Sequence, residues 1–275
     1  MASPKIIHYC WFGGNPLPKL VMQCIESWKK FCPDYEIIEW NETNFDVHCC
    51  RYIEEAYKAK KWAFVSDYAR FWILYNYGGV YLDTDVELLK PLENLSNTFV
   101  GFENKETVSS GLIRAALKGD EICGLLLESY HNDCFDLGDG VFNVKTVGVR
   151  ETAILEKFGL KRNGLLQVVC GTTIYPQDYF CPKSFTDESI TLTDNTYSIH
   201  HYSSSWYTEE EIYAQKLKRK ISKCMPKKLA GHIAAFFTQW KYRGFIKAIK
   251  NLFKKAKNKK RGKTLNDNNT NPNLQ

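Results

Sequence analysis

Residues 62–85 constrain the fold of this chain more than any other part of the sequence. Aromatic residues recur at spacings of three and four across residues 62–77, which predicts a helix with one buried face. Gly78 and Gly79 predict the end of that helix, because glycine adopts the left-handed backbone conformation that a helix C-cap needs. The apolar run after them predicts a strand over residues 80–83.

Short apolar runs alternate with helical patterns along the first two hundred residues. This alternation is typical of an α/β domain with a largely parallel sheet. A second helix is predicted over residues 17–31, behind two prolines. The other predicted strands are residues 5–11, 35–40, 99–102, 172–175 and 198–202.

The charge of the chain is divided between its two parts. The net charge is +6, from 37 Lys and Arg against 31 Asp and Glu. Residues 207–275 hold 18 basic and 4 acidic residues, a balance of +14, which leaves 19 against 27, or −8, for residues 1–206. A basic tail on an acidic body suggests that the tail contacts an anionic polymer or membrane. We therefore expect a catalytic domain over 1–206, a basic helical extension over 207–262 and a disordered tail over 263–275.

The cysteine pattern and the lengths of the apolar runs indicate the cellular compartment of the protein. The chain has ten cysteines, but they are scattered and no C-x-x-C pair occurs. Its first residues are too polar for the apolar region of a signal peptide, and it has no run of eighteen apolar residues. These observations predict a cytoplasmic protein with reduced thiols.

Asp83 and Asp85 form a D-x-D motif directly after the predicted strand. Residues two apart in an extended segment project the same way, so Tyr81 is expected on the same face. The carboxyl end of a strand is where open α/β sheets bind ligands. Two carboxylates aimed at one point favour a divalent cation, Mn²⁺ or Mg²⁺, shared with substrate phosphates. The alternative is a turn that carries two solvated acids.

Three further segments contain candidate site residues. Asp67 and Arg70 lie three apart on one helix face, either as neighbours of the motif or as an exposed ion pair. Trp11 ends the first strand and could stack on a nucleobase or pack in the core. In the last segment, His200 or His201 could bind the metal, whereas paired histidines alone are unspecific. Ser204 and Trp206 complete that segment, as donors to a metal-bound phosphate.

Taken in order, these blocks resemble glycosyltransferase family 32. This family includes yeast initiating mannosyltransferases and many bacterial capsule-locus enzymes, and it is distantly similar to the large clostridial glucosylating toxins. The resemblance implies an α/β fold, a GT-A type Rossmann-like nucleotide-sugar-binding domain, here with a C-terminal helical basic extension. It also implies a retaining, metal-dependent hexosyltransferase of surface polysaccharide synthesis. The matching segments are residues 4–14, 63–85, 174–183 and 199–206.

The resemblance also implies a role for individual residues. The implied catalytic residues are Asp83, Asp85 and Arg70. The implied metal ligands are Asp85 and His201, with His200 as the alternative and Asp83 in indirect contact. The implied donor-binding residues are Trp11, Asp67, Arg70, Tyr81, Asp83, Ser204 and Trp206. Between residues 101 and 150 the chain departs from the family pattern, and no role is assigned there.

Residues 231–261 carry apolar side chains at spacings of three and four, with lysines between them. This pattern indicates an interfacial helix attracted to anionic lipid, or else a helix docked on its own domain. A nucleic-acid partner is not expected, because the body is acidic and no base-reading module is visible. The tail predicts a peripheral enzyme at the inner face of the cell membrane, acting on a glycan or polyprenyl-linked acceptor.

Two other functions are compatible with parts of the sequence. Phosphatases of the haloacid dehalogenase type also place D-x-D after an apolar strand. They normally do so near the start of the chain and follow it with small residues, whereas Val86 and Glu87 follow here. An inactive carbohydrate-binding or membrane-scaffold protein could keep the fold alone. The joint presence of Asp67, Arg70 and both motif aspartates argues against that loss of function.

Overall fold

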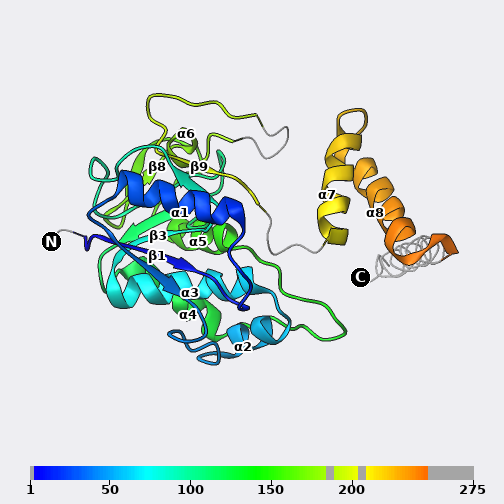
Figure 1. Ribbon diagram of the computed structural model, residues 1–275, viewed down its shortest axis with the longest axis horizontal. Helices are drawn as coiled ribbons and strands as arrows, with labels where there is room; N and C mark the ends of the chain where they lie inside the picture. The colour runs from blue at the N-terminus through cyan, green and yellow to red at the C-terminus, as the bar shows by residue number, and fades with distance from the viewer. Residues whose placement is uncertain (1–2, 184–188, 204–208, 247–275) are drawn as a thin grey trace, which may run out of the picture. The chain divides into compact units, whose positions relative to one another are not determined.

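The structure is a computed structural model that describes residues 3–183, 189–203 and 209–246. The chain divides into two compact units, residues 1–203 and 204–275. The first unit is an α/β domain in which helices cover both faces of a central sheet (Figure 1).

The central sheet has seven strands in the described residues, in the order β2-β1-β3-β6-β5-β8-β7. β2, β1, β3, β5 and β8 run in one direction, and β6 and β7 run against them. The predicted α/β fold with a largely parallel sheet is confirmed. A separate two-stranded sheet pairs β4 (Val86–Leu88) with β9 (Ser198–His200). The strands of the central sheet are β1 (Ile6–Cys10), β2 (Glu36–Trp40), β3 (Gly79–Leu82), β5 (Phe99–Gly101), β6 (Ile113–Ala116), β7 (Gln167–Val169) and β8 (Thr172–Tyr175).

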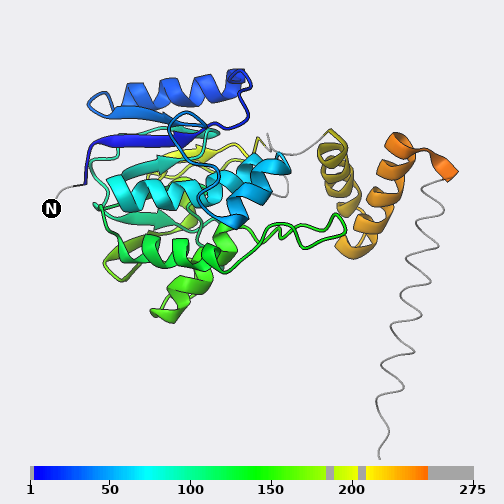
Figure 2. The ribbon, with the colours of Figure 1, turned by 90° about the horizontal axis from the view of Figure 1, so that it is seen from below.

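Helix α1 (Lys19–Phe31) covers one face of the sheet, and α3 (Trp62–Tyr77) covers the other face, with further helices packed on α3 (Figure 2). Successive side chains of a strand point to opposite faces of the sheet, so the apolar residues of the strands belong to two separate core layers. Ile7 and Leu82 pack with Trp28 of α1, whereas Cys10 and Tyr81 face the opposite layer. The other helices of the unit are α2 (Arg51–Lys58), α4 (Glu121–His131), α5 (Val147–Lys157) and the short α6 (Gln177–Phe180).

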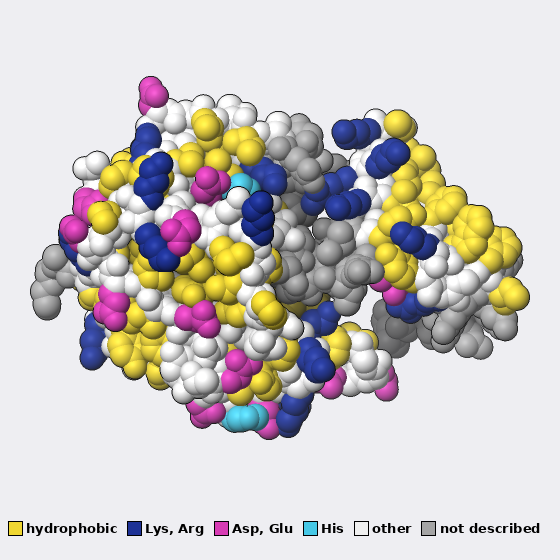
Figure 3. Space-filling view, viewed as in Figure 1, with side chains coloured by type: hydrophobic (Ala, Val, Ile, Leu, Met, Phe, Trp, Pro, Cys, Tyr) yellow, Lys and Arg dark blue, Asp and Glu magenta, His cyan; other side chains and the backbone are white. Residues whose placement is uncertain are grey.

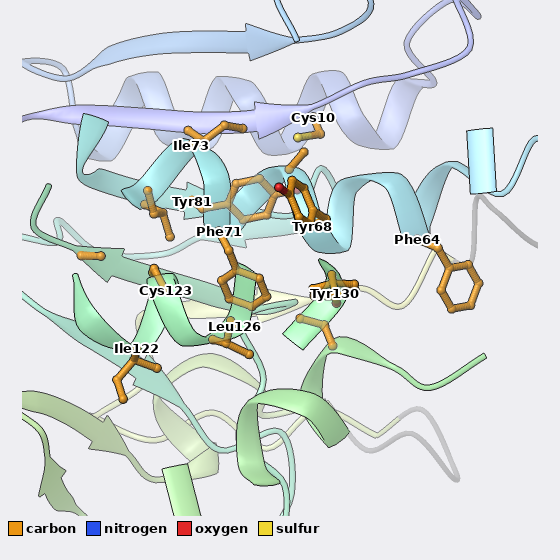
Figure 4. Close-up of a cluster of buried hydrophobic side chains, with 14 of the residues drawn as sticks. Cys10, Phe64, Tyr68, Phe71, Ile73, Tyr81, Ile122, Cys123, Leu126 and Tyr130 are labelled. Carbon is orange, nitrogen blue, oxygen red and sulfur yellow. The ribbon is translucent and has the colours of Figure 1, made fainter. Parts of the chain in front are cut away.

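Helix α3 supplies most of the second core layer. Tyr68 and Phe71 are buried and lie beside Leu126 and Tyr130 of α4 (Figure 4), and Phe64 of the same buried cluster packs on Phe135. The neighbouring residues Asp67 and Arg70 of the same helix are also buried, at 8% and 2% exposure. Helix α3 therefore holds a charged pair inside the domain while its apolar residues fix the position of the helix.

The end of α3 agrees with the prediction. Gly78 is the C-cap with φ of 71°, and Gly79 continues with φ of 95° into β3. A Cβ atom on Gly79 would lie 2.8 Å from the carbonyl oxygen of Ile6 on β1, so a side chain is excluded there as well. The two glycines let α3 turn directly into the strand that leads to the motif.

The second unit contains α7 (Glu209–Ser222) and α8 (Lys227–Arg243) in its described residues. Ala230, Ala234 and Thr238 of α8 are buried, which allows a close approach to α7. The predicted continuous helix over 231–261 is interrupted, because Gly244 ends α8 with φ of 83°. Residues 247–261 of that prediction lie outside the described residues. Within the described part of the chain, no helix has both the length and the apolar character required to cross a bilayer.

Candidate active site

The D-x-D motif occupies the turn between β3 and β4. The backbone N–H of Val86 donates to the carbonyl oxygen of Asp83 over 3.0 Å, which closes the turn. Because β4 pairs with β9, Val86 lies opposite His200, and the histidine reaches the motif from far along the chain. Asp83, Asp85 and His200 each offer a ligand atom, and these atoms lie within 4.8 Å of one another.

The two adjacent histidines point in different directions. Nε2 of His200 lies 3.1 Å from Oδ1 of Asp85, whereas Nε2 of His201 lies 2.8 Å from Oε2 of Glu87. Successive side chains of a strand project to opposite faces, so only one of the two can face the motif. The structure thus places the alternative ligand, His200, beside the aspartates and turns the preferred one, His201, toward Glu87.

Asp85 is held as a carboxylate. Burial opposes its ionisation, but His200 and the backbone N–H of Ser203, which donates to Oδ2 over 2.7 Å, outweigh that effect. The pKa of Asp85 therefore lies well below its usual range. Burial would lower the pKa of His200, yet its contact with Asp85 raises that pKa well above the ordinary value. The two groups form a buried ion pair at the motif, and His200 would have to release its proton in order to bind a metal ion.

The guanidinium of Arg70 is fully engaged inside the protein. An arginine has five N–H donors in a fixed fork, and five groups surround this one. Four hydrogen bonds and one ion pair hold this guanidinium inside the protein, and the implied donor-binding role of Arg70 stays a prediction. Arg70 holds the aspartates in position. Its partners are the carbonyl and Oγ of Ser66 at 3.1 and 3.4 Å, Oδ1 of Asp67 at 2.9 Å, the carbonyl of Ser110 at 3.0 Å and Oδ1 of Asp83 at 3.2 Å.

Asp67 and Asp83 are carboxylates whose ionisation is opposed by their surroundings. Burial raises the pKa of Asp67 to about 6, although the charge of Arg70 acts in the opposite direction. Burial likewise raises the pKa of Asp83, again against the effect of Arg70. One guanidinium is therefore shared between two carboxylates.

Tyr81 lies beneath the site, not on its surface. Its side chain is 1% exposed, and the guanidinium carbon of Arg70 lies 4.7 Å from the ring centroid, a cation–π contact. The implied packing of Tyr81 on a nucleoside would need that cover to move. In the described structure Tyr81 supports Arg70.

Of the remaining predicted site residues, the structure describes Trp11. Trp11 follows β1 and is half-buried, and its Nε1–H donates to the carbonyl oxygen of Asn15 over 2.6 Å. This places the indole beside the same end of the sheet as the motif, because β1 and β3 are parallel neighbours. Ser204 and Trp206 lie outside the described residues.

The sequence reasoning assigned no role to two residues that the fold brings to the site. Glu103 follows β5, and its carboxylate interacts with Tyr202, His200 and Asp83. Ser110, which precedes β6, accepts a hydrogen bond from Arg70. Both lie in the stretch that departs from the family pattern, so neither had a motif to mark it. The apolar strand just before Glu103 was the only available signal.

The chemistry of the Asp83, Asp85 and His200 group fits a divalent cation. Two carboxylates and an imidazole suit Mn²⁺ and similar ions. Nδ1 of His200 is buried and has no hydrogen-bond partner among the described residues. Without a cation, the two aspartates would lie together in a largely buried position with only Arg70 and His200 to offset their charge.

Comparison with known proteins finds a family model that matches part of this chain. Residues 18–100 match the family described as "Glycosyltransferase sugar-binding region containing DXD motif". Two fission yeast (Schizosaccharomyces pombe) proteins are similar to the chain: inositol phosphoceramide mannosyltransferase 3, 32% identical over 102 residues, and inositol phosphoceramide mannosyltransferase 1, 31% identical over 103. Each alignment covers 34% of this chain, and 27% and 31% of the respective relative. The chain therefore matches less than a third of the length of either relative.

Two solved structures show a loose likeness to the chain. One is titled PaToxG Glycosyltransferase, with 18% identity, a TM-score of 0.43, and coverage of 56% of this chain and 69% of that one. The other is a glycosyltransferase involved in the glycosylation of the major capsid of PBCV-1, with 10% identity, a TM-score of 0.40, and coverage of 84% and 99%.

The family match contains the whole of α3, the two glycines, β3 and the D-x-D turn, which carry Asp67, Arg70, Asp83 and Asp85, whereas His200 lies outside the match. The yeast relatives carry mannosyltransferase names, in agreement with the implied group. Residues 18–100 of this chain therefore match the DXD-containing sugar-binding region of glycosyltransferases, and this stretch is similar to the two yeast mannosyltransferases.

Proposed function

We propose that this protein transfers a sugar from a nucleotide-diphosphate sugar to a glycan acceptor, with a divalent cation held by Asp83, Asp85 and His200. The observation that carries the proposal is the convergence of these three side chains within 4.8 Å at the carboxyl end of β3. That edge of an α/β sheet is where ligands bind. A phosphatase would need a nucleophilic aspartate free to attack, whereas Asp83 contacts Arg70 and Asp85 contacts His200.

In this proposal each site residue has its own role in the sugar-transfer reaction. The reaction breaks the bond between the anomeric carbon and the diphosphate, so positive charge grows on the sugar and negative charge on the leaving group. A bound divalent ion supplies Lewis-acid stabilisation of that leaving diphosphate. Arg70 keeps Asp83 oriented, and Ser203 and His200 keep Asp85 ionised. Trp11 is proposed to stack on the donor base, and Ser204 and Trp206 to contact the phosphates.

We further propose that the anomeric configuration is retained, as in the family the chain resembles. Front-face attack, with the departing phosphate as the base, needs no protein nucleophile. A covalent route needs a carboxylate opposite the leaving group. Glu103, which stands beside His200 and Asp83, is the candidate for that alternative.

The proposed activity is tested with a panel of nucleotide-diphosphate sugars, with and without Mn²⁺. We expect slow release of nucleotide diphosphate from one donor, in the presence of the ion only, because water can replace the acceptor. Chelation should abolish the release and added Mn²⁺ should restore it. Phosphate release from simple phosphomonoesters, without turnover of any sugar donor, would support the phosphatase alternative and contradict the proposal.

We also propose that the second unit attaches the enzyme to an anionic membrane surface, where a polyprenyl-linked acceptor would lie. Large apolar side chains gather over the helices of this unit (Figure 3). Phe237, Trp240 and Phe245 are 41–50% exposed, and the ring of Trp240 contacts the rings of both phenylalanines. Exposed Lys228 and Lys241 provide positive charge nearby. Aromatic residues beside lysines are typical of helices that bind lipid interfaces.

The membrane proposal is tested by replacing the exposed aromatic residues. The triple variant Phe237→Ser, Trp240→Ser, Phe245→Ser should bind vesicles of anionic phospholipid at least tenfold more weakly, a loss of about 1.4 kcal/mol. Donor hydrolysis should be unchanged, because the catalytic group lies in the first unit. The control Leu165→Ser, Leu166→Ser removes apolar side chains of similar exposure, 63% and 57%, from that first unit. Equal vesicle binding by the triple variant and the wild type would contradict the proposal.

A further inference from the structure

Glu151 of α5 and Arg114 of β6 form an ion pair that the proposed reaction does not use. Both side chains have no exposed surface, and Nη1 of Arg114 lies 2.5 Å from Oε1 of Glu151. The second oxygen of Glu151 has a different partner, because Oε2 accepts a hydrogen bond from the backbone N–H of Ser110 over 2.7 Å. Glu151 of α5 therefore holds β6 through Arg114 and the loop before β6 through Ser110.

Ser110 connects this carboxylate to the motif. Its backbone N–H points to Glu151, and its carbonyl oxygen accepts from Nη1 of Arg70 over 3.0 Å. The same Nη1 lies 3.2 Å from Oδ1 of Asp83. Because Arg70 is buried, a shift of the Ser110 carbonyl would leave an N–H of Nη1 without its hydrogen-bond acceptor inside the protein. Arg70 could recover that partner only by moving, and Asp83 would move with it.

The loop before β6 has little freedom to absorb such a shift. Thr152, next to Glu151, accepts from the backbone N–H of Val108 over 2.9 Å and donates to its carbonyl over 3.2 Å. A Cβ atom on Gly111 would lie 3.4 Å from Oδ2 of Asp83, so the loop packs directly against the motif. Helix α5 thus clamps the loop from one side while Asp83 borders it on the other.

We propose that Glu151 is a positioning residue for the metal-binding motif, acting through Ser110 and Arg70 on Asp83. It does not contact the site itself. The proposal rests on the proposed metal-dependent transfer, since it assigns to Glu151 the orientation of one ligand of that metal. A buried carboxylate with two separate donors is suited to this role, because each oxygen fixes one neighbour.

The test is the variant Glu151→Gln, with Mn²⁺ alone as the probe. A glutamine has one acceptor oxygen, so it cannot satisfy Arg114 and Ser110 together. We expect the affinity for Mn²⁺, measured by titration calorimetry without donor, to fall at least tenfold. The kcat of donor hydrolysis should fall as well, while the KM for the donor stays within about twofold. Wild-type Mn²⁺ affinity in this variant would overturn the proposal.

The matched control is Asp120→Asn. Asp120 is the other carboxylate partner of Arg114, at 3.1 Å, and caps α4, but it has no link to Ser110. We expect a lowered melting temperature with unchanged Mn²⁺ affinity. An equal loss of Mn²⁺ affinity in Asp120→Asn would show that general destabilisation is the cause, and it would overturn the positioning role.

A second variant covers the case in which Glu151→Gln does not fold. The double variant Arg114→Met, Glu151→Leu removes both buried charges, a replacement that many cores tolerate. The backbone N–H of Ser110 still loses its acceptor, so the tenfold loss of Mn²⁺ affinity should persist, and its absence would overturn the proposal. Failure of the proposed function gives a different result. If that function is wrong, Asp85→Ala binds Mn²⁺ as well as the wild type does. If only the Glu151 proposal is wrong, the wild type still shows Mn²⁺ binding that Asp85→Ala loses.

Discussion

Replacing Asp85 with alanine is expected to remove nearly all transfer activity. Asp85 is the most strongly ionised carboxylate of the metal-binding group, because His200 and the Ser203 N–H both favour its charged form. Loss of about 4 kcal/mol of metal-dependent charge stabilisation corresponds to a fall in kcat on the order of 10³-fold. Release of nucleotide diphosphate under saturating Mn²⁺ and donor measures this effect. Activity within tenfold of the wild type would exclude Asp85 as a metal ligand.

Two further variants make this result specific. Asp85→Asn keeps an oxygen that can accept from Ser203, so it separates the loss of charge from the loss of that hydrogen bond. The histidines provide a matched pair: His200→Ala should resemble Asp85→Ala, whereas His201→Ala should lose much less, because His201 faces Glu87. The opposite order would restore His201, the ligand preferred from the sequence, to the metal site.

Replacing Arg70 with methionine is expected to have the largest effect on stability. The guanidinium is 2% exposed and is the shared partner of Asp67 and Asp83. Without it two carboxylates remain in a largely buried position, and breaking such a pair costs about 3–5 kcal/mol of the free energy of unfolding. Urea unfolding followed by tryptophan fluorescence measures the change.

The control for Arg70→Met is Arg162→Met. Arg162 forms a two-point ion pair with Glu156 that is exposed to solvent, and such pairs contribute little to stability. We therefore expect no measurable shift of the urea midpoint in Arg162→Met. Equal midpoints for the two variants would contradict the view that Arg70 neutralises the buried aspartates.

The elements around the motif could be predicted because their signals are local. The residues of α3 show helical spacing over four turns, and Gly78 and Gly79 mark its end, so the bounds Trp62–Tyr77 were predicted residue for residue. β4, β6 and β7 were not predicted. Their length is not the reason, because β5 and β8 are equally short and were predicted. β4 and β6 each contain a charged residue, Glu87 and Arg114, that interrupts the apolar run, and β7 has only two apolar residues.

The sequence predicted which residues belong to the candidate site better than it predicted how they are arranged in space. The aspartates were expected to share one point, and the structure groups both with His200. The choice between the histidines depends on the register of β4 with β9, which no local pattern encodes. The hydrogen bond of Arg70 with Ser110 was equally hidden, because Ser110 lies forty residues away in a stretch without a motif.

The pairing of β4 with β9 has a consequence for how the site forms during synthesis. Both aspartates lie within the first hundred residues, but the histidine beside them belongs to the last strand of the first unit. A nascent chain that has emerged only as far as β8 carries an incomplete ligand set, with two acids and no imidazole. The group of two carboxylates and one imidazole is therefore complete only after the seven described strands of the central sheet have left the ribosome.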